Sequence, residues 1–115
     1  MKIKINDSTF EVKLAITREE KEKGMMNRKF DETFNAMLFL MDVPQSCFWM
    51  KNCIIPLDII MIDNNVITKI HHNCPPCTTE KCQRYCGNGN MVLEVMGGLC
   101  GKRNIKEGDM IISNI

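Results

Sequence analysis

Short segments of alternating polar and apolar residues recur along the chain and predict a protein built mainly of β-strands. Residues 2–5 alternate, a cluster of turn residues follows, and the alternation resumes over residues 10–14, which predicts a hairpin. A second hairpin is predicted where an apolar run, an Asp-Asn-Asn turn and another apolar run follow one another. The predicted strands after the first hairpin are residues 36–41, 47–50, 57–62, 66–70, 91–96 and 110–113.

Helical signals are few and short. Thr17 and Glu20 have the spacing of a capping box, which predicts a short helix that ends near Gly24. Residues 97–103 could form one or two further turns, and residues 73–90 are predicted to be a loop. The expected fold is mostly β, with an α+β character at the margin. It is a compact, barrel-like antiparallel sheet with one or two short helices, in a single domain of residues 1–115.

Composition narrows the possible partners. The 115 residues are enough for one hydrophobic core. Fifteen basic and fourteen acidic residues give a formal charge of +1, which argues against nucleic-acid binding driven by bulk charge. There is no apolar run long enough to span a membrane, and the first residues lack the apolar core of a signal peptide. We therefore expect an intracellular protein without a membrane partner.

The segment from Phe48 to Asp58 contains the single tryptophan of the chain, followed by a cation and an amide. Trp49 offers a large rigid ring, Lys51 a charge, and Asn52 both a donor and an acceptor. This combination favours a small polar or anionic ligand that rests on an aromatic surface. The alternative is that Trp49 belongs to the core and that the two polar residues form a solvated turn.

Two acidic residues lie inside apolar runs. Asp58 precedes four consecutive apolar residues, and Glu94 has two apolar neighbours on each side. A carboxylate that faces a core needs a partner, and Arg28 and Lys51 are the candidates. The two carboxyls could form an acid–base pair. Alternatively, each could point outward or make one structural ion pair.

Seven cysteines in so short a chain are unusual, and four of them lie within the predicted loop. Four thiols in one short loop could bind a tetrahedral zinc ion, form two disulfides, or stay free. A redox-active Cys-x-x-Cys pair at the start of the loop would need a thioredoxin-like context, which is absent. The remaining three are predicted to be small buried hydrophobes. The loop set is Cys74, Cys77, Cys82 and Cys86, and the buried set is Cys47, Cys53 and Cys100.

Several blocks of the sequence, in order and spacing, resemble the family catalogued as domain of unknown function 192. The most specific block is Phe-Trp-Met-Lys-Asn followed by Pro-Leu-Asp, and the resemblance covers about residues 9–113. The other matching blocks are Gly24-Met25-Met26 with Arg28, Ala36 to Phe39, Cys77-Thr78 with Cys82 and Tyr85, Val92-Leu93-Glu94 with Gly98, and residues 105–109.

The resemblance implies a small, single, mostly-β domain without a firmly assigned activity. It directs attention to the tryptophan segment and to Arg28, Asp58 and Glu94, which match the motifs of the family. Cys74 and Cys86 depart from the two-cysteine loop of the family, which points to a metal or an added cross-link in this protein. Many members of the family are exported, in contrast to the intracellular location expected here.

The leading hypothesis is a binding module with a ligand or partner surface around Trp49, Lys51, Asn52, Arg28 and Asp58, the last of which would orient one of the two cations. The ligand could be a small anion, a sugar, a peptide end or another protein.

Two further classes of function remain open. One is an enzyme or thiol-redox protein that uses Asp58 and Glu94, or the cysteines of residues 74–86. Zinc is the cofactor that this cysteine loop could hold. The other is a structural subunit of a larger assembly, for which exposed apolar patches would be the sign.

Overall fold

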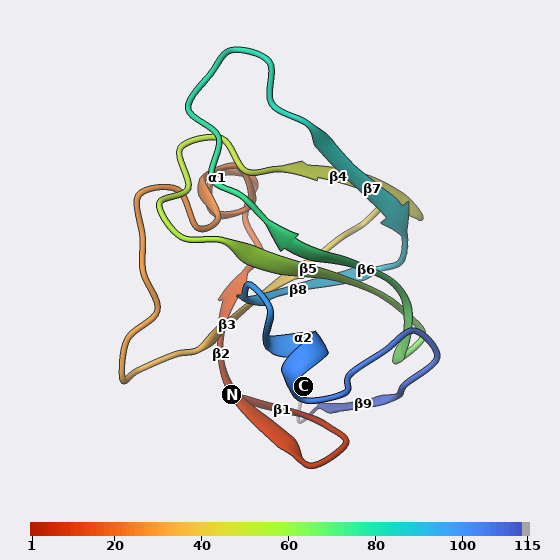
Figure 1. The fold of residues 1–115 in the computed structure, drawn as a ribbon. Coiled ribbons are helices and arrows are strands. Elements are labelled where there is room, and N and C mark those ends of the chain that lie inside the picture. Colours follow the sequence, from red (N-terminus) through yellow and green to blue (C-terminus); the bar gives the residue numbers. More distant parts are fainter. Residues whose placement is uncertain (114–115) are drawn as a thin grey trace.

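A computed structural model describes residues 1–113 of the chain (Figure 1). The last two residues of the predicted domain 1–115 lie outside the described residues. Seven strands form one sheet in the order β6-β5-β8-β3-β2-β1-β9, and two more form a separate ribbon, β4-β7. The sheet strands are β1 (Lys2–Ile5), β2 (Ser8–Ala15), β3 (Ala36–Leu40), β5 (Leu57–Asp63), β6 (Val66–Cys74), β8 (Met91–Met96) and β9 (Ile111–Ser113), and the ribbon strands are β4 (Gln45–Trp49) and β7 (Arg84–Asn88).

The seven-stranded sheet curls until its two edges meet, so the predicted barrel-like, mostly-β fold is confirmed. Backbone hydrogen bonds run from Ile67 N to Asp109 O and from Ile111 N to Asn65 O, each 2.9 Å long, and they join the β6 edge to the β9 edge. One pair, β2 with β3, is parallel, whereas the other pairs of the described residues are antiparallel. The parallel pair departs from the predicted antiparallel sheet.

The central strands are buried on both faces, which explains why β3, β5 and β8 are almost continuously apolar. Alternate side chains of these strands point into the barrel and form an inner core. The others point out of the barrel and form an outer core. The inner core includes Leu38, Ile60, Ile62, Leu93 and Val95, and the outer core includes Met37, Phe39, Ile59, Met61 and Val92.

The β4-β7 ribbon covers the outer core (Figure 1). The ring of Phe48 in β4 packs edge-on against Phe39 at a centroid distance of 4.9 Å. The Thr68 hydroxyl donates a 2.6 Å hydrogen bond to the Asn88 carbonyl and so fastens β7 to β6. Gly87 allows the close approach, because a Cβ atom there would lie 2.8 Å from Cγ of Met61.

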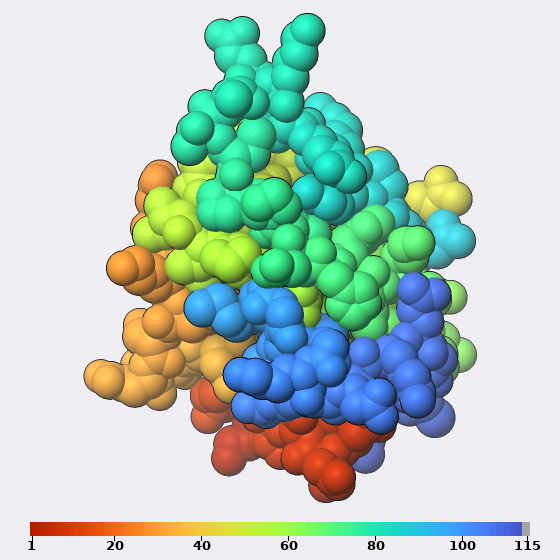
Figure 2. All heavy atoms as spheres, viewed as in Figure 1, coloured from red at the N-terminus to blue at the C-terminus, as the bar shows by residue number. Residues whose placement is uncertain are grey.

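The prediction that residues 73–90 form one loop is wrong in part. Strand β6 continues to Cys74, and β7 occupies residues 84–88. Only Tyr85 of β7 is a buried apolar side chain, so the alternation was too weak to recognise. The remaining loop projects from one end of the molecule, opposite the N-terminal strand (Figure 2).

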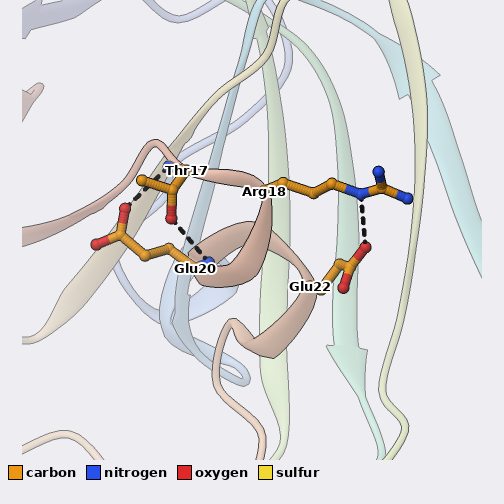
Figure 3. Close-up of polar contacts among 4 residues, drawn as sticks. All are labelled: Thr17, Arg18, Glu20 and Glu22. Atoms are coloured by element: carbon orange, nitrogen blue, oxygen red, sulfur yellow. Dashed lines mark hydrogen bonds and ion pairs between the residues drawn. The ribbon is translucent and has the colours of Figure 1, made fainter.

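Both predicted helices are present, as α1 (Arg18–Lys23) and α2 (Leu99–Lys102). The capping box forms as predicted: Glu20 N donates to the Thr17 hydroxyl at 3.1 Å, and Thr17 N donates to the Glu20 carboxylate at 2.9 Å (Figure 3). The backbone N–H of Gly24 bonds to the Glu20 carbonyl and ends α1. No helix in the described part of the chain is long and apolar enough to cross a membrane.

The cysteines form two disulfides, Cys47–Cys86 and Cys77–Cys82. The prediction that Cys47 is a buried thiol is wrong, because it lies on the exposed face of the ribbon directly opposite Cys86. Cys74 is instead a buried thiol, like Cys53 and Cys100. Zinc in the loop is not supported, because three of its four sulfurs are in disulfides and the described residues contain no cluster of three or more metal-binding side chains.

Replacement of Cys47 and Cys86 by serine should lower the free energy of unfolding by about 3–4 kcal/mol, since this disulfide closes a loop of 39 residues. Urea denaturation measures the change. The double variant of Cys77 and Cys82 is the matched control, and the shorter loop, with a separation of 5 residues, predicts a loss of only about 2 kcal/mol. Equal losses would show that loop length does not govern the contribution of these cross-links.

Candidate functional site

Glu94 lies at the centre of the sheet with its side chain on the outer face. Its neighbours Leu93 and Val95 point into the barrel, and Glu94 is paired with Met37 of β3 and Ile59 of β5. The residue is only 3% exposed. Within residues 1–113, its carboxyl group has no hydrogen-bond or ion-pair partner. Such a group is costly to bury, so its presence calls for an explanation.

A pocket of about 240 Å³ opens above this carboxyl group. Its walls come from the end of α1 and the residues that follow it, from β3 and β4, and from the turn after Trp49. A backbone bridge between Met26 and Cys53 joins two of these segments. The walls are mainly apolar, and Glu94 is the buried acidic group among the lining residues, which include Met25, Phe39, Met41, Phe48, Trp49 and Cys53.

Burial raises the pKa of Glu94 from 4.5 to about 8. The carboxyl group is therefore mainly protonated at neutral pH, and its O–H can donate a hydrogen bond. A neutral acid in an apolar pocket is suited to meet a carbonyl or other acceptor of a ligand. Acidic groups with a raised pKa are often found at binding and catalytic sites.

Trp49 forms part of the rim of the pocket and is 37% exposed, so it is not a core residue. Two cations lie against its ring: Lys51 Nζ is 5.6 Å and Arg84 Cζ is 5.4 Å from the ring centroid. Arg84 is directly opposite Trp49 in the register of the ribbon. These contacts hold the two positive charges against Trp49, whose ring forms part of the rim.

Asp58 has a different position. It is fully buried, and its carboxylate, which was predicted to orient Lys51 or Arg28, accepts three backbone hydrogen bonds instead. The donors are Asn73 N at 2.7 Å, Gly98 N at 2.9 Å and Cys100 N at 2.8 Å. Asp58 thus caps the start of α2 and ties it to β6, which is a structural role.

Arg28 and Asn52 also lie apart from the lining of this pocket. The Arg28 guanidinium is 5.5 Å from the ring centroid of Phe34, and it lines a neighbouring hollow. Asn52 adopts a positive φ of 60°, and its backbone groups bond with Asn27 N and the Cys77 carbonyl. Trp49 and Glu94 therefore line the same pocket and Lys51 contacts the Trp49 ring, whereas Arg28, Asn52 and Asp58 lie elsewhere.

The sequence alone did not indicate the walls of the pocket or the cation Arg84. Phe39 and Phe48 are parts of apolar strands, where function cannot be distinguished from packing. Arg84 was assigned to the loop because β7 was not recognised. Gly24-Met25-Met26 gave a signal, since this block matches the family pattern and forms one wall.

The buried thiols are poor nucleophiles. Burial, and then the nearby Glu94 charge, raise the pKa of Cys53 to about 12. Burial raises the pKa of Cys74 to about 11. Both thiols are protonated at neutral pH, so a reactive thiolate is not available from them.

The model of the family of domain of unknown function 192, described as "uncharacterized ACR", matches residues 1–113 of the sequence. The chain belongs to this family. Two solved structures are similar to this member of the family. One, from Novosphingobium aromaticivorans, is a protein of unknown function with 32% identity and a TM-score of 0.83, and the match covers 97% of this chain and 84% of that chain.

The second solved structure, from Sinorhizobium meliloti, is described as a proposed transcription regulator. It has 25% identity and a TM-score of 0.80, and the match covers 96% of this chain and 89% of that chain. No curated protein matches this family member. The comparisons therefore establish the family and the fold, and they attach no reaction to either.

Proposed function

We propose that this member of the domain of unknown function 192 family is a binding module whose ligand enters the pocket between Trp49 and Glu94. The observation that carries the proposal is the buried Glu94 carboxyl group, which has no partner among the described residues and lies in a pocket with mainly apolar walls. The ligand would place an apolar group among the phenylalanine and methionine side chains. A carbonyl of the ligand would accept a hydrogen bond from the protonated carboxyl.

An enzyme that uses Asp58 and Glu94 as an acid–base pair fits the structure less well. The two residues lie on neighbouring strands, but Asp58 belongs to the inner face of the sheet and Glu94 to the outer face. Both oxygens of Asp58 are already engaged with backbone N–H groups. The sheet thus separates the two carboxyl groups, and a pocket with one buried acidic group and an aromatic rim favours binding over catalysis.

We also infer that this protein works in an oxidising compartment. The Cys47–Cys86 and Cys77–Cys82 disulfides support this inference, since such bonds persist mainly outside the reducing cytosol. The inference departs from the intracellular location that the sequence alone suggested.

A neutral probe, N-hexanoylglycinamide, tests the proposed pocket. Trp49 is the single tryptophan, so its fluorescence reports occupancy directly, and a dissociation constant of roughly millimolar is expected for a ligand of this size. Because only the protonated acid donates, affinity should fall about tenfold between pH 6.5 and pH 9. Glu94→Gln keeps a donor and should bind without this pH dependence, whereas Glu94→Met should lose about tenfold in affinity.

Other charged or titratable groups near the pocket are Lys21, Glu22 and Lys23 of α1, Cys53, and Cys74 of β6. The Glu94→Gln variant leaves all of them in place, so it isolates the contribution of Glu94. Amide NMR spectra of each variant confirm that the fold is retained. If the probe does not bind to the wild-type protein, or binds with equal affinity to Glu94→Met, the proposed pocket is wrong.

A further inference from the structure

We infer that the ligand of this pocket is an amphiphilic organic anion, with its apolar acyl or aryl part inside and its negative group at the opening. This inference rests on the proposed function and specifies the chemical class of the ligand. It follows from two lysines that line the pocket, Lys21 and Lys23, from two cations that lie against Trp49 at its rim, Lys51 and Arg84, and from the acid at the floor.

The cations form two pairs. Lys21 and Lys23 in the last turn of α1 line the pocket itself. Lys51 and Arg84 lie against the Trp49 ring, which forms part of the rim. Contact with the negative face of the ring restricts these two long side chains, so their charges stay close to Trp49.

The four cations are not neutralised by the protein. Within residues 1–113, none of them takes part in an ion pair. The carboxylate of Glu22, the acidic residue between the two lysines, bonds to Arg18 at 3.1 Å (Figure 3). The formal charge of the whole chain is only +1, so four cations without an ion pair in residues 1–113, two lining the pocket and two on its rim residue Trp49, are a local concentration of charge. An anionic group there would find several partners.

The inside of the pocket favours an uncharged, apolar group, in contrast to its opening. The walls are apolar, and Glu94 carries a proton at neutral pH, so an ionised group at the floor would lose its hydration without gaining a counter-ion. A ligand with its charge at one end and an apolar chain at the other satisfies both regions. An amide or ester carbonyl between them would accept the Glu94 proton in a hydrogen bond.

Three probes with the same hexanoyl amide group test this inference. N-hexanoylglycine is an anion, N-hexanoylglycinamide is neutral, and N-(2-aminoethyl)hexanamide is a cation. At pH 6.5 and low salt, the anion should bind about tenfold more tightly than the neutral probe, and the cation should bind more weakly than both. The preference for the anion should shrink in 0.5 M sodium chloride, because salt screens exposed charges.

The double variant Lys21→Gln, Lys23→Gln should lower the affinity for the anion about threefold more than the affinity for the neutral probe. Lys4→Gln, an exposed change on β1, is the matched control and should alter neither affinity. If the anion and the neutral probe bind equally, or if the cation binds most tightly, the inference about charge is wrong and the proposed pocket stands. If none of the three probes binds, both proposals are wrong.

Discussion

The Glu94→Gln variant should become progressively more stable than the wild-type protein as the pH rises from 5 to 8. In the unfolded chain Glu94 ionises with a pKa near 4.5, whereas burial raises its pKa in the folded protein to about 8. Between these values the unfolded state has lost the proton that the folded state retains, so the wild-type stability falls with rising pH. Since one pKa unit corresponds to about 1.4 kcal/mol, the loss reaches about 4 kcal/mol by pH 8.

Urea denaturation of both proteins at several pH values measures this difference. Below pH 4.5 the carboxyl group is protonated in both states, so the two proteins should then differ by about 1 kcal/mol or less. Glu107→Gln, an exposed change in the loop before β9, is the matched control. Its stability should change with pH in parallel with that of the wild-type protein. Parallel curves for Glu94→Gln and the wild-type protein would contradict the burial of an unpaired acid. Residues that are retained for function often lower the stability of the folded protein, and Glu94 fits this pattern.

The Asp58→Asn variant should be destabilised by about 3 kcal/mol. The carboxylate accepts three backbone hydrogen bonds, with one oxygen shared by Asn73 N and Gly98 N and the other bound to Cys100 N. An amide of the same shape replaces one acceptor with an NH₂ group, which would face a backbone N–H donor in a fully buried site. Hydrogen bonds to a charged group contribute about 1.5–3 kcal/mol each, so the loss is large.

Thermal or urea unfolding at constant pH measures this effect. Asp63→Asn is the matched control, since Asp63 is exposed at the end of the same strand and should change the stability by less than about 0.5 kcal/mol. Ligand binding provides a second comparison. Asp58→Asn should bind N-hexanoylglycinamide with unchanged affinity under conditions where it is folded, and a loss of affinity there would show that Asp58 belongs to the site.

The fold could be predicted where local patterns were strong. The first hairpin, the capping box at Thr17 and the apolar runs of β3, β5 and β8 each specify one local structure. The parallel pairing of β2 with β3 and the order of the strands around the barrel could not be predicted, because they depend on contacts between distant segments. Strand β7 was missed because its sequence, Arg-Tyr-Cys-Gly-Asn, contains a single buried aromatic residue and a glycine.

The candidate site, like the fold, could be predicted only where the local sequence gave a clear signal. Trp49 and Glu94 stood out as exceptions to the pattern around them: one is the single tryptophan, and the other is an acid within an apolar run. The same kind of exception drew attention to Asp58. The sequence does not show, however, that three backbone N–H groups bond to Asp58 and that no group in residues 1–113 bonds to Glu94. Only the placement of α2 against β5 distinguishes the two acids.

The central claim is that Glu94 lies uncharged and without a partner in a ligand pocket. The most direct test is to follow its side-chain carboxyl carbon by NMR as a function of pH, with the signal assigned from the Glu94→Gln spectrum. We expect a midpoint near 8 in the free protein, and a higher midpoint when N-hexanoylglycinamide is bound, since the probe requires the protonated form. A midpoint near 4.5, or one that the bound probe leaves unchanged, would contradict it.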